Sequence, residues 1–316
     1  MSYEKELRKK AIVIIPYFGK LPNYFNLWLK SASFNSDFDY LIFTDDDCSK
    51  YQIPSNVKIE KCLFEDIVKR IQNKLDFPIH LNKCYKLCDF KPSYGYIFEK
   101  EVEGYDFWAY GDIDLIYGNL SNFITKEICD SFEKILGVGH LCLIKNNKKM
   151  NEIFMKKIEG CYFYKDVFTS EDIYSFDEFG QNGIGGHYQI CEKSGIKIYN
   201  KMFYADIMYS TNKLKCHFGG SQKEIKEEFK KKHVRFLFDN GKLVQLCKSN
   251  QSKGKEVAYV HLQKRKMKPN NITDNKFYIY PHYFDNKKRK FRFSFDEMGY
   301  QKNYLKGKIK SFLKKR

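Results

Sequence analysis

Two aspartates, Asp112 and Asp114, are separated by one residue and directly follow the apolar run at residues 107–110. In extended backbone, residues i and i+2 project to the same side, so both carboxylates can face one cation while Ile113 packs inward. Hard divalent cations prefer oxygen ligands of this kind. A cation held there stabilises the negative charge that builds on a departing phosphate. The spacing therefore predicts a divalent-metal site that acts on a phosphate-bearing substrate.

The elements that must position this pair are those of an α/β fold. Residues 11–15 form a continuous, mostly β-branched run that is typical of a buried parallel strand. Apolar residues at helical spacing follow at 23–32, and residues 38–44 form a second strand, which together make a βαβ unit. The run 107–110 is then a short buried strand that delivers the aspartates. Further expected elements are helices at 64–75, 82–98 (with a break at Pro92) and 151–158, strands at 140–144, 256–262 and 277–280, a loop at 177–186, and a hairpin of residues 235–238 and 242–246 around Asn240 and Gly241.

The strand, its aromatic residues, the Asp-x-Asp pair and the following glycine resemble the DxD motif of GT-A glycosyltransferases. The wider stretch 89–118 looks like an uncharacterised bacterial family associated with surface-polysaccharide synthesis, and the resemblance covers about residues 11–266. It implies an α/β fold with a GT-A (Rossmann-like) mixed sheet flanked by helices. It also implies a hexosyltransferase, dependent on Mn²⁺ or Mg²⁺, that moves a sugar from a nucleotide-sugar donor, with a UDP-sugar expected. The implied acceptor is a growing glycan or a lipid-linked oligosaccharide of capsule, O-antigen or another surface polysaccharide.

The same resemblance implies that a histidine late in the chain completes the metal shell. The expected metal ligands are Asp112, Asp114 and His261. An imidazole in this set favours Mn²⁺ over Mg²⁺. His217 is the alternative third ligand. Lys264 and Lys266 follow His261 closely and are expected to act as point charges on the diphosphate.

Donor contacts are expected where strands end, because ligands of open α/β sheets bind outside the carboxyl ends of the strands. The loop after the first strand should meet the base, with Asp45 nearby. Lys86 and Asp89 resemble a basic and acidic pair that precedes the motif in related enzymes, and they are expected to reach ribose or donor sugar. Gly111 and Gly118 leave room for a ligand close to the backbone. The full expected donor-binding set is Pro16, Tyr17, Phe18, Asp45, Lys86, Asp89, Tyr110, Gly111, Asp112, Lys264 and Lys266.

Transfer with inversion at the sugar carbon needs a base for the acceptor hydroxyl, and carboxylates are the usual choice. Asp177 and Glu178 lie in the segment 177–186, which is rich in acidic residues and glycine, and they are the predicted catalytic residues. If the configuration is retained, no such base is required. The sequence leaves these two outcomes open.

Bulk composition indicates one folded catalytic domain with an appendage. The chain has 316 residues, of which 43% are hydrophobic and 17% aromatic, enough material for a packed core. We expect the glycosyltransferase domain at 1–281, with a nucleotide-binding half at about 1–118 and an acceptor half at about 119–281, and a basic tail at 282–316. The ten cysteines include no Cys-x-x-Cys pair and are expected to be reduced thiols of a cytoplasmic protein.

The net charge of +17 belongs to the last third of the chain. Residues 1–214 hold 28 basic and 30 acidic side chains, a net charge of −2, whereas residues 215–316 hold 28 and 9, a net charge of +19. Within 300–316 apolar residues recur at helical spacing among lysines, at Leu305, Ile309, Phe312 and Leu313. This pattern predicts a basic amphipathic helix on an anionic membrane, and a terminal helix packed on its own domain is the alternative. No run reaches the ~18 apolar residues of a membrane span, so we expect a peripheral protein at the inner face of the cytoplasmic membrane.

Two other classes of protein compete with this interpretation. A haloacid-dehalogenase-like phosphatase also uses Asp-x-Asp after a strand, but it places the motif near the N-terminus with Thr or Val at the position that Ile116 occupies here. A nucleic-acid-binding protein would use the basic third of the chain. It would leave Asp112 and Asp114 without a task, and no nucleic-acid-binding motif is present.

Overall fold

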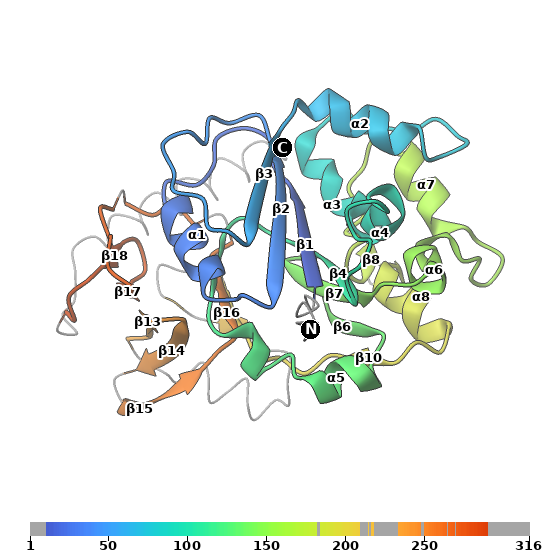
Figure 1. The fold of residues 1–316 in the computed structure, drawn as a ribbon. Helices are drawn as coiled ribbons and strands as arrows, with labels where there is room; N and C mark the ends of the chain where they lie inside the picture. Colours follow the sequence, from blue (N-terminus) through green and yellow to red (C-terminus); the bar gives the residue numbers. More distant parts are fainter. Residues whose placement is uncertain are drawn as a thin grey trace, which may run out of the picture. The chain divides into compact units, whose positions relative to one another are not determined.

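The computed structural model describes residues 11–181, 184–208, 214, 216–217, 233–247, 250–263, 265–268 and 270–289 (Figure 1). The described chain divides into two compact units, the first made of residues 11–113 and 121–201 and the second of residues 114–120 and those from 202 onward. The predicted halves, 1–118 and 119–281, divide the chain differently from these units, because residues 121–201 belong to the first unit and residues 114–118 to the second. The predicted terminal helix at 300–316 lies outside the described residues.

The first unit is built on a mixed seven-stranded sheet with the order β10-β6-β7-β4-β1-β2-β3. Its strands are β1 Ala11–Pro16, β2 Phe38–Thr44, β3 Val57–Lys61, β4 Phe107–Gly111, β6 Lys134–Val138, β7 Leu141–Lys145 and β10 Ile198–Tyr199. Strands β3, β2, β1 and β4 are parallel, and β7 runs antiparallel to both β4 and β6. The mixed α/β sheet that the sequence indicates is therefore present.

Parallel pairing brings the predicted site segments of this unit to one edge of its sheet. Ile14 lies beside both Leu41 of β2 and Tyr110 of β4 in the register of the three strands. Parallel strands present their carboxyl ends at the same edge, so the loop after Pro16, Asp45 after β2 and Asp112 after β4 follow there.

Short helices accompany this sheet. They are α1 Phe25–Ser33, α2 Phe64–Gln72, α3 Leu87–Phe90, α4 Tyr94–Ile97, α5 Lys126–Ser131, α6 Lys148–Asn151, α7 Phe163–Thr169 and α8 His187–Lys193. Helix α4 packs closely on β4, because a Cβ built at Gly95 would lie 2.2 Å from Nε1 of Trp108. Only glycine permits this approach of the helix to the strand that carries the aspartates.

Two helix predictions are corrected by the structure. Residues 82–98 do not form one helix with a single break; α3 and α4 alternate with 3₁₀ turns at Cys84–Lys86 and Lys91–Ser93. The helix expected at 151–158 is wrong, because α6 already ends at Asn151 and a 3₁₀ turn follows at Ile153–Met155. The Asn147 side chain accepts a hydrogen bond from the Met150 amide, and this cap begins the helix earlier than the apolar pattern suggests.

Three strands of the large sheet, β3, β6 and β10, were not expected. β3 is an edge strand in which charged residues alternate with apolar ones and Lys58 is exposed. Its sequence therefore lacks the continuous apolar run by which the other strands were predicted. β6 contains Leu136 at a φ of 68°, and its register against β7 shifts between Ile135 and Val138. Within the expected loop at 177–186, β8 Gly180–Gln181 and β9 Ile184–Gly185 form a short antiparallel pair.

The second unit contains two further sheets. A four-stranded sheet has the order β12-β11-β16-β5 and a five-stranded sheet the order β15-β14-β13-β17-β18. Their strands are β5 Leu115–Tyr117, β11 Ala205–Ile207, β12 Cys216–His217, β13 Arg235–Asp239, β14 Lys242–Cys247, β15 Asn250–Glu256, β16 Tyr259–His261, β17 Lys276–Ile279 and β18 Phe284–Asp285. The strand expected at 256–262 is thus divided between two sheets.

The turn between β13 and β14 follows directly from its two residues. Asn240 has a φ of 47° and Gly241 a φ of 85°, the positive values that a type I′ turn requires at both positions. The two strands pair antiparallel on either side of this turn.

Among the described residues, no helix has the length and apolar character needed to cross a membrane.

Candidate active site

In the first unit, a lysine joins the first aspartate of the motif to the acidic segment after residue 176. Lys91 donates a hydrogen bond from Nζ to Oδ1 of Asp112 at 2.7 Å and to the carbonyl of Gly139 at 2.8 Å. The same Nζ lies 3.5 Å from Oδ2 of Asp177. The backbone amide of Asp112 donates to the carbonyl of His140 at 3.0 Å. One ammonium group therefore sets the positions of two carboxylates that the sequence singles out separately.

The charges in this cluster act on one another. Burial lowers the pKa of Lys91, but the adjacent carboxylates of Asp112 and Asp177 outweigh it and raise the pKa above its ordinary value. Burial raises the pKa of Asp177 from 3.8 to about 7, with Lys91 opposing and the neighbouring Glu178 adding to the rise. Lys91 thus stays protonated, while Asp177 exchanges its proton near neutral pH. A carboxylate in that range is suited to general base work.

Gly139 brings both predicted catalytic carboxylates close to the backbone. Its amide donates to Oε1 of Glu178 at 2.8 Å. A Cβ built at this position would lie 2.4 Å from Oδ2 of Asp177 and 2.9 Å from Oε1 of Glu178. The Tyr110 hydroxyl, from β4, donates to the backbone carbonyl of Asp177 at 2.9 Å. The lack of a side chain at residue 139 is therefore what allows the two acids to lie where they do.

Lys86 and Asp89 have partners inside the first unit. Their side chains are 1% and 0% exposed and form an ion pair at 3.1 Å. Lys86 also donates to the Asp172 carbonyl, and Asp89 accepts hydrogen bonds from the amides of Tyr174 and Phe176. The pair thus anchors the segment that leads to Asp177, and its expected contact with ribose or donor sugar stays a prediction.

The loop after β1 is ordered by the acids that follow β2. The Gly19 amide donates to Oδ1 of Asp45 at 2.7 Å, and the Leu21 amide donates to Oδ2 of Asp46 at 3.0 Å. Phe18 packs edge-on against Phe64, with 5.5 Å between the ring centroids. Asp45 is exposed, whereas Pro16, Tyr17 and Phe18 are half-buried. The expected contact of these residues with the base of a nucleotide stays a prediction.

In the second unit, Asp114, directly before β5, faces His261 of the neighbouring strand β16. β5 and β16 pair antiparallel with Leu115 opposite His261, and the Leu262 amide donates to the Asp114 carbonyl at 3.0 Å. Oδ1 of Asp114 lies 3.4 Å from Nε2 of His261, and the two side chains are 10% and 11% exposed. When two ligand atoms bind one divalent ion at bond lengths of about 2.1 Å and an angle of 90°, they lie about 3 Å apart. The Asp114 and His261 atoms therefore need to move only slightly closer together to bind the same ion.

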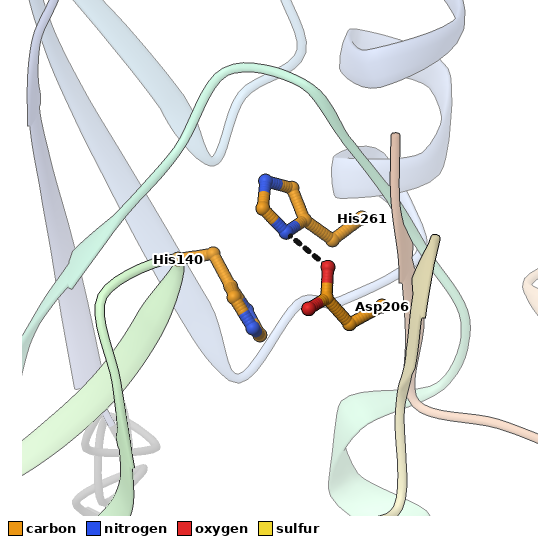
Figure 2. Close-up of side chains that lie close together, drawn as sticks. All are labelled: His140, Asp206 and His261. Carbon is orange, nitrogen blue, oxygen red and sulfur yellow. Dashed lines mark hydrogen bonds and ion pairs between the residues drawn. The ribbon is translucent and has the colours of Figure 1, made fainter. Parts of the chain in front are cut away.

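Asp206, on β11, holds the other nitrogen of the same histidine. Its Oδ1 accepts a hydrogen bond from Nδ1 of His261 at 2.8 Å, as Figure 2 shows. The same oxygen accepts from Nε2 of Gln263 at 2.7 Å. His140, also drawn in Figure 2, belongs to the first unit.

Four further residues singled out in the sequence are described by the structure to different extents. The backbone of His217 pairs with Asp206 across β11 and β12. Lys266 is exposed, and Lys264 lies outside the described residues. In β5 and its flank, Gly118 does not leave ligand space, since a Cβ there would meet the Val257 carbonyl at 2.6 Å and Cβ of Leu243 at 2.8 Å. Gly118 is a packing residue, which corrects the sequence prediction.

Sequence reasoning missed Lys91 and Asp206. Lys91 stands in the stretch that carries the family resemblance, but its spacing from Asp112 holds no regular period. Asp206 is a single acid between the apolar residues of a short strand, with buried Ala205 and Ile207 on either side. An acid interrupting an apolar strand is the signal that could have identified it.

Comparison with known protein families assigns this chain to a family. The model of a family of unknown function, DUF6625, matches residues 13–288, and the chain belongs to this family. No curated protein matches the chain. Among solved structures, galactosyltransferase LgtC in complex with donor and acceptor sugar analogues is similar at a TM-score of 0.39 and 12% identity, over 79% of this chain and 86% of LgtC.

A second solved structure is the apo form of glycosyltransferase GlyE from Streptococcus pneumoniae. It is similar at a TM-score of 0.34 and 14% identity, over 62% of this chain and 46% of GlyE. Similarities of this size carry no inference about activity, which has to come from the residues of the site.

Proposed function

We propose that this protein is a divalent-metal-dependent glycosyltransferase that uses a nucleotide-sugar donor. The observation that carries the proposal is the placement of Asp114 opposite Nε2 of His261, at 3.4 Å and largely shielded from solvent, in the Asp-x-Asp segment that follows β4. The other aspartate of the motif, Asp112, lies two residues earlier in the chain and is the second carboxylate that the proposal uses. The donor is a UDP-sugar, and the product is a bacterial surface polysaccharide such as capsule or O-antigen.

The proposed metal ligands are Asp112, Asp114 and His261. Together they offer two carboxylates and one imidazole. Mn²⁺ accepts such a mixed set more readily than Mg²⁺, which demands oxygen ligands and holds its waters. When bound, the ion supplies Lewis-acid stabilisation of the charge on the leaving diphosphate. Lys91, which donates a hydrogen bond to Oδ1 of Asp112, fixes the position of that carboxylate.

On the acceptor side, Asp177 is the proposed base if the reaction inverts the sugar configuration. Its pKa of about 7 allows it to take a proton from an acceptor hydroxyl at neutral pH. Glu178, held by the Gly139 amide, is its partner in this role. The donor nucleotide is proposed to meet Pro16, Tyr17, Phe18 and Asp45 at the carboxyl ends of β1 and β2. Tyr110, Gly111, Lys264 and Lys266 complete the proposed donor-binding set.

We further propose a cytoplasmic location at the inner membrane face, which the charge of the last third of the chain supports. Residues 215–316 hold 28 basic and 9 acidic side chains. A polybasic segment of this kind is drawn to anionic lipid, at about 1 kcal/mol for each surface-adjacent lysine. A lipid-linked acceptor at that surface would then be presented to the site.

The deciding experiment measures the release of nucleoside diphosphate from a panel of nucleotide sugars with Mn²⁺, first narrowed by thermal shift, since a ligand of the folded state raises its melting temperature. Asp114→Ala should abolish turnover. Asp239→Asn, which removes an ion pair with Lys276 in the five-stranded sheet, is the matched control and should retain it. Undiminished turnover in Asp114→Ala, or full activity after exhaustive chelation, would overturn the proposal. Release of inorganic phosphate from a phosphate monoester, without nucleotide-sugar turnover, would favour the phosphatase class.

A further inference from the structure

We infer that Asp206 is a positioning residue that fixes the proton of His261 on Nδ1 and thereby presents Nε2 to the metal ion. The inference rests on the proposed metal site and adds to it a residue that contacts no ion or substrate. All the side chains involved lie in the second unit.

The two ring nitrogens of His261 have different partners. A carboxylate only accepts hydrogen bonds, so the 2.8 Å contact with Oδ1 of Asp206 requires a proton on Nδ1. On the other side, Nε2 lies 3.4 Å from Oδ1 of Asp114, beyond the usual range of a hydrogen bond. A neutral imidazole carries one proton, so the arrangement leaves the Nε2 lone pair directed to the ligand side. That is the tautomer in which a histidine binds a metal through Nε2.

Asp206 is itself held in a fixed position, so it can keep the proton of His261 on Nδ1. β11 and β16 are parallel neighbours, with Asp206 and His261 directly paired in register. On its other side β11 pairs with β12, so Asp206 lies on an inner strand of the four-stranded sheet. Gln263 donates to the same carboxylate oxygen at 2.7 Å. The side chains of Asp206 and His261 are 16% and 11% exposed, so water competes little for the contact between them.

The expected consequence is a stronger and better oriented ligand. A carboxylate that accepts the second N–H of a metal-binding histidine fixes the ring and increases the basicity of the coordinating nitrogen, and its removal typically weakens metal binding 10- to 100-fold. Loss of a direct ligand such as Asp114 should weaken binding more than that. A positioning residue such as Asp206 and a direct ligand such as Asp114 therefore differ in how much their loss weakens metal binding. They also lie at different nitrogens of His261, Asp206 at Nδ1 and Asp114 beside Nε2.

The test is a Mn²⁺ titration of the full-length protein, followed by electron paramagnetic resonance of free Mn²⁺. We expect Asp206→Ala to raise the dissociation constant about 10- to 100-fold. Asp206→Asn keeps an oxygen that can accept from Nδ1, so its effect should be smaller. Asp239→Asn serves as the control for loss of a carboxylate elsewhere in this unit, and it should leave the constant unchanged. Circular dichroism should show that every variant is folded.

A second measurement needs neither metal nor activity. In ¹⁵N nuclear magnetic resonance spectra of the metal-free protein at alkaline pH, His261 should carry its proton on Nδ1, and Asp206→Ala should transfer it to Nε2. Unchanged Mn²⁺ affinity and tautomer in Asp206→Ala, while Asp114→Ala loses binding, would overturn this inference and leave the metal site intact. Loss in Asp206→Ala as complete as in Asp114→Ala would overturn it too, by making Asp206 a ligand. Unaltered binding in both variants would remove the metal site itself.

Discussion

The buried carboxylate of Asp177 should make the protein less stable at alkaline pH, and Asp177→Asn should relieve this. The pKa of Asp177 is raised from 3.8 to about 7 on folding, chiefly by burial. Between these values the folded state keeps a proton that the unfolded chain has lost, so stability falls as the pH rises through this window. Below pH 4 the Asp177 carboxyl is protonated in both the folded and the unfolded state, so it does not change the folding free energy there.

The magnitude follows from the two pKa values. Each pKa unit corresponds to about 1.36 kcal/mol, so the interval from 3.8 to about 7 corresponds to about 4 kcal/mol of folding free energy lost by pH 8. An asparagine at this position carries no charge at any of these pH values and escapes the loss. For a unit of 150–250 residues, 1 kcal/mol moves the melting temperature by about 2–4 °C. Asp177→Asn should therefore melt roughly 10 °C above the natural protein at pH 8 and at the same temperature near pH 4.

The assay is thermal unfolding of both proteins from pH 4 to pH 8, with nucleotide-sugar turnover measured alongside. The stabilised variant should lose turnover if Asp177 is the base, because a site that keeps a buried charge sacrifices stability for function. Asp239→Asn is the control of opposite sign, because hydrogen bonding with Lys276 lowers the pKa of Asp239, and that stabilisation is lost as the pH falls. A melting-temperature difference between Asp177→Asn and the natural protein that does not change with pH, or that is negative at pH 8, would refute the reasoning.

Three further predictions concern other parts of the chain. Lys91→Met should lower the free energy of unfolding at pH 8 by about 3–5 kcal/mol, as expected when one partner of a buried ion pair is removed; chemical denaturation measures this, and a near-neutral effect would mean that Lys91 is not needed to hold Asp112. His261→Ala should weaken Mn²⁺ binding more than His217→Ala, and the reverse order in a metal titration would transfer the ligand role to His217. Deleting residues 300–316 should release the protein from anionic vesicles in cosedimentation without lowering nucleotide-sugar hydrolysis, and equal vesicle binding by both forms would contradict a membrane role for the tail.

Local patterns in the sequence suffice for the strands that carry the motif. The buried β-branched run of β1, the apolar run of β4 and the Asn240-Gly241 turn each depend on residues a few positions apart. The period of side chains along a strand and the φ values of a turn are properties of the local backbone, so the sequence reveals them. The Asp-x-Asp pair is equally local, because Asp112 and Asp114 lie two positions apart in the sequence. The extended backbone expected for the pair is wrong, because the chain turns at Ile113 and Asp114 between β4 and β5.

Only the tertiary structure decided which distant side chains complete the site. Lys91 reaches Asp112 across 21 positions, and Asp206 reaches His261 across 55, and neither separation matches a helix or strand period. Such contacts depend on which strands become neighbours and in what register, and that is settled by the packing of the whole unit. The same cause explains Lys86, whose charge suggests a ligand contact, although packing places it in the interior to hold the chain before Asp177.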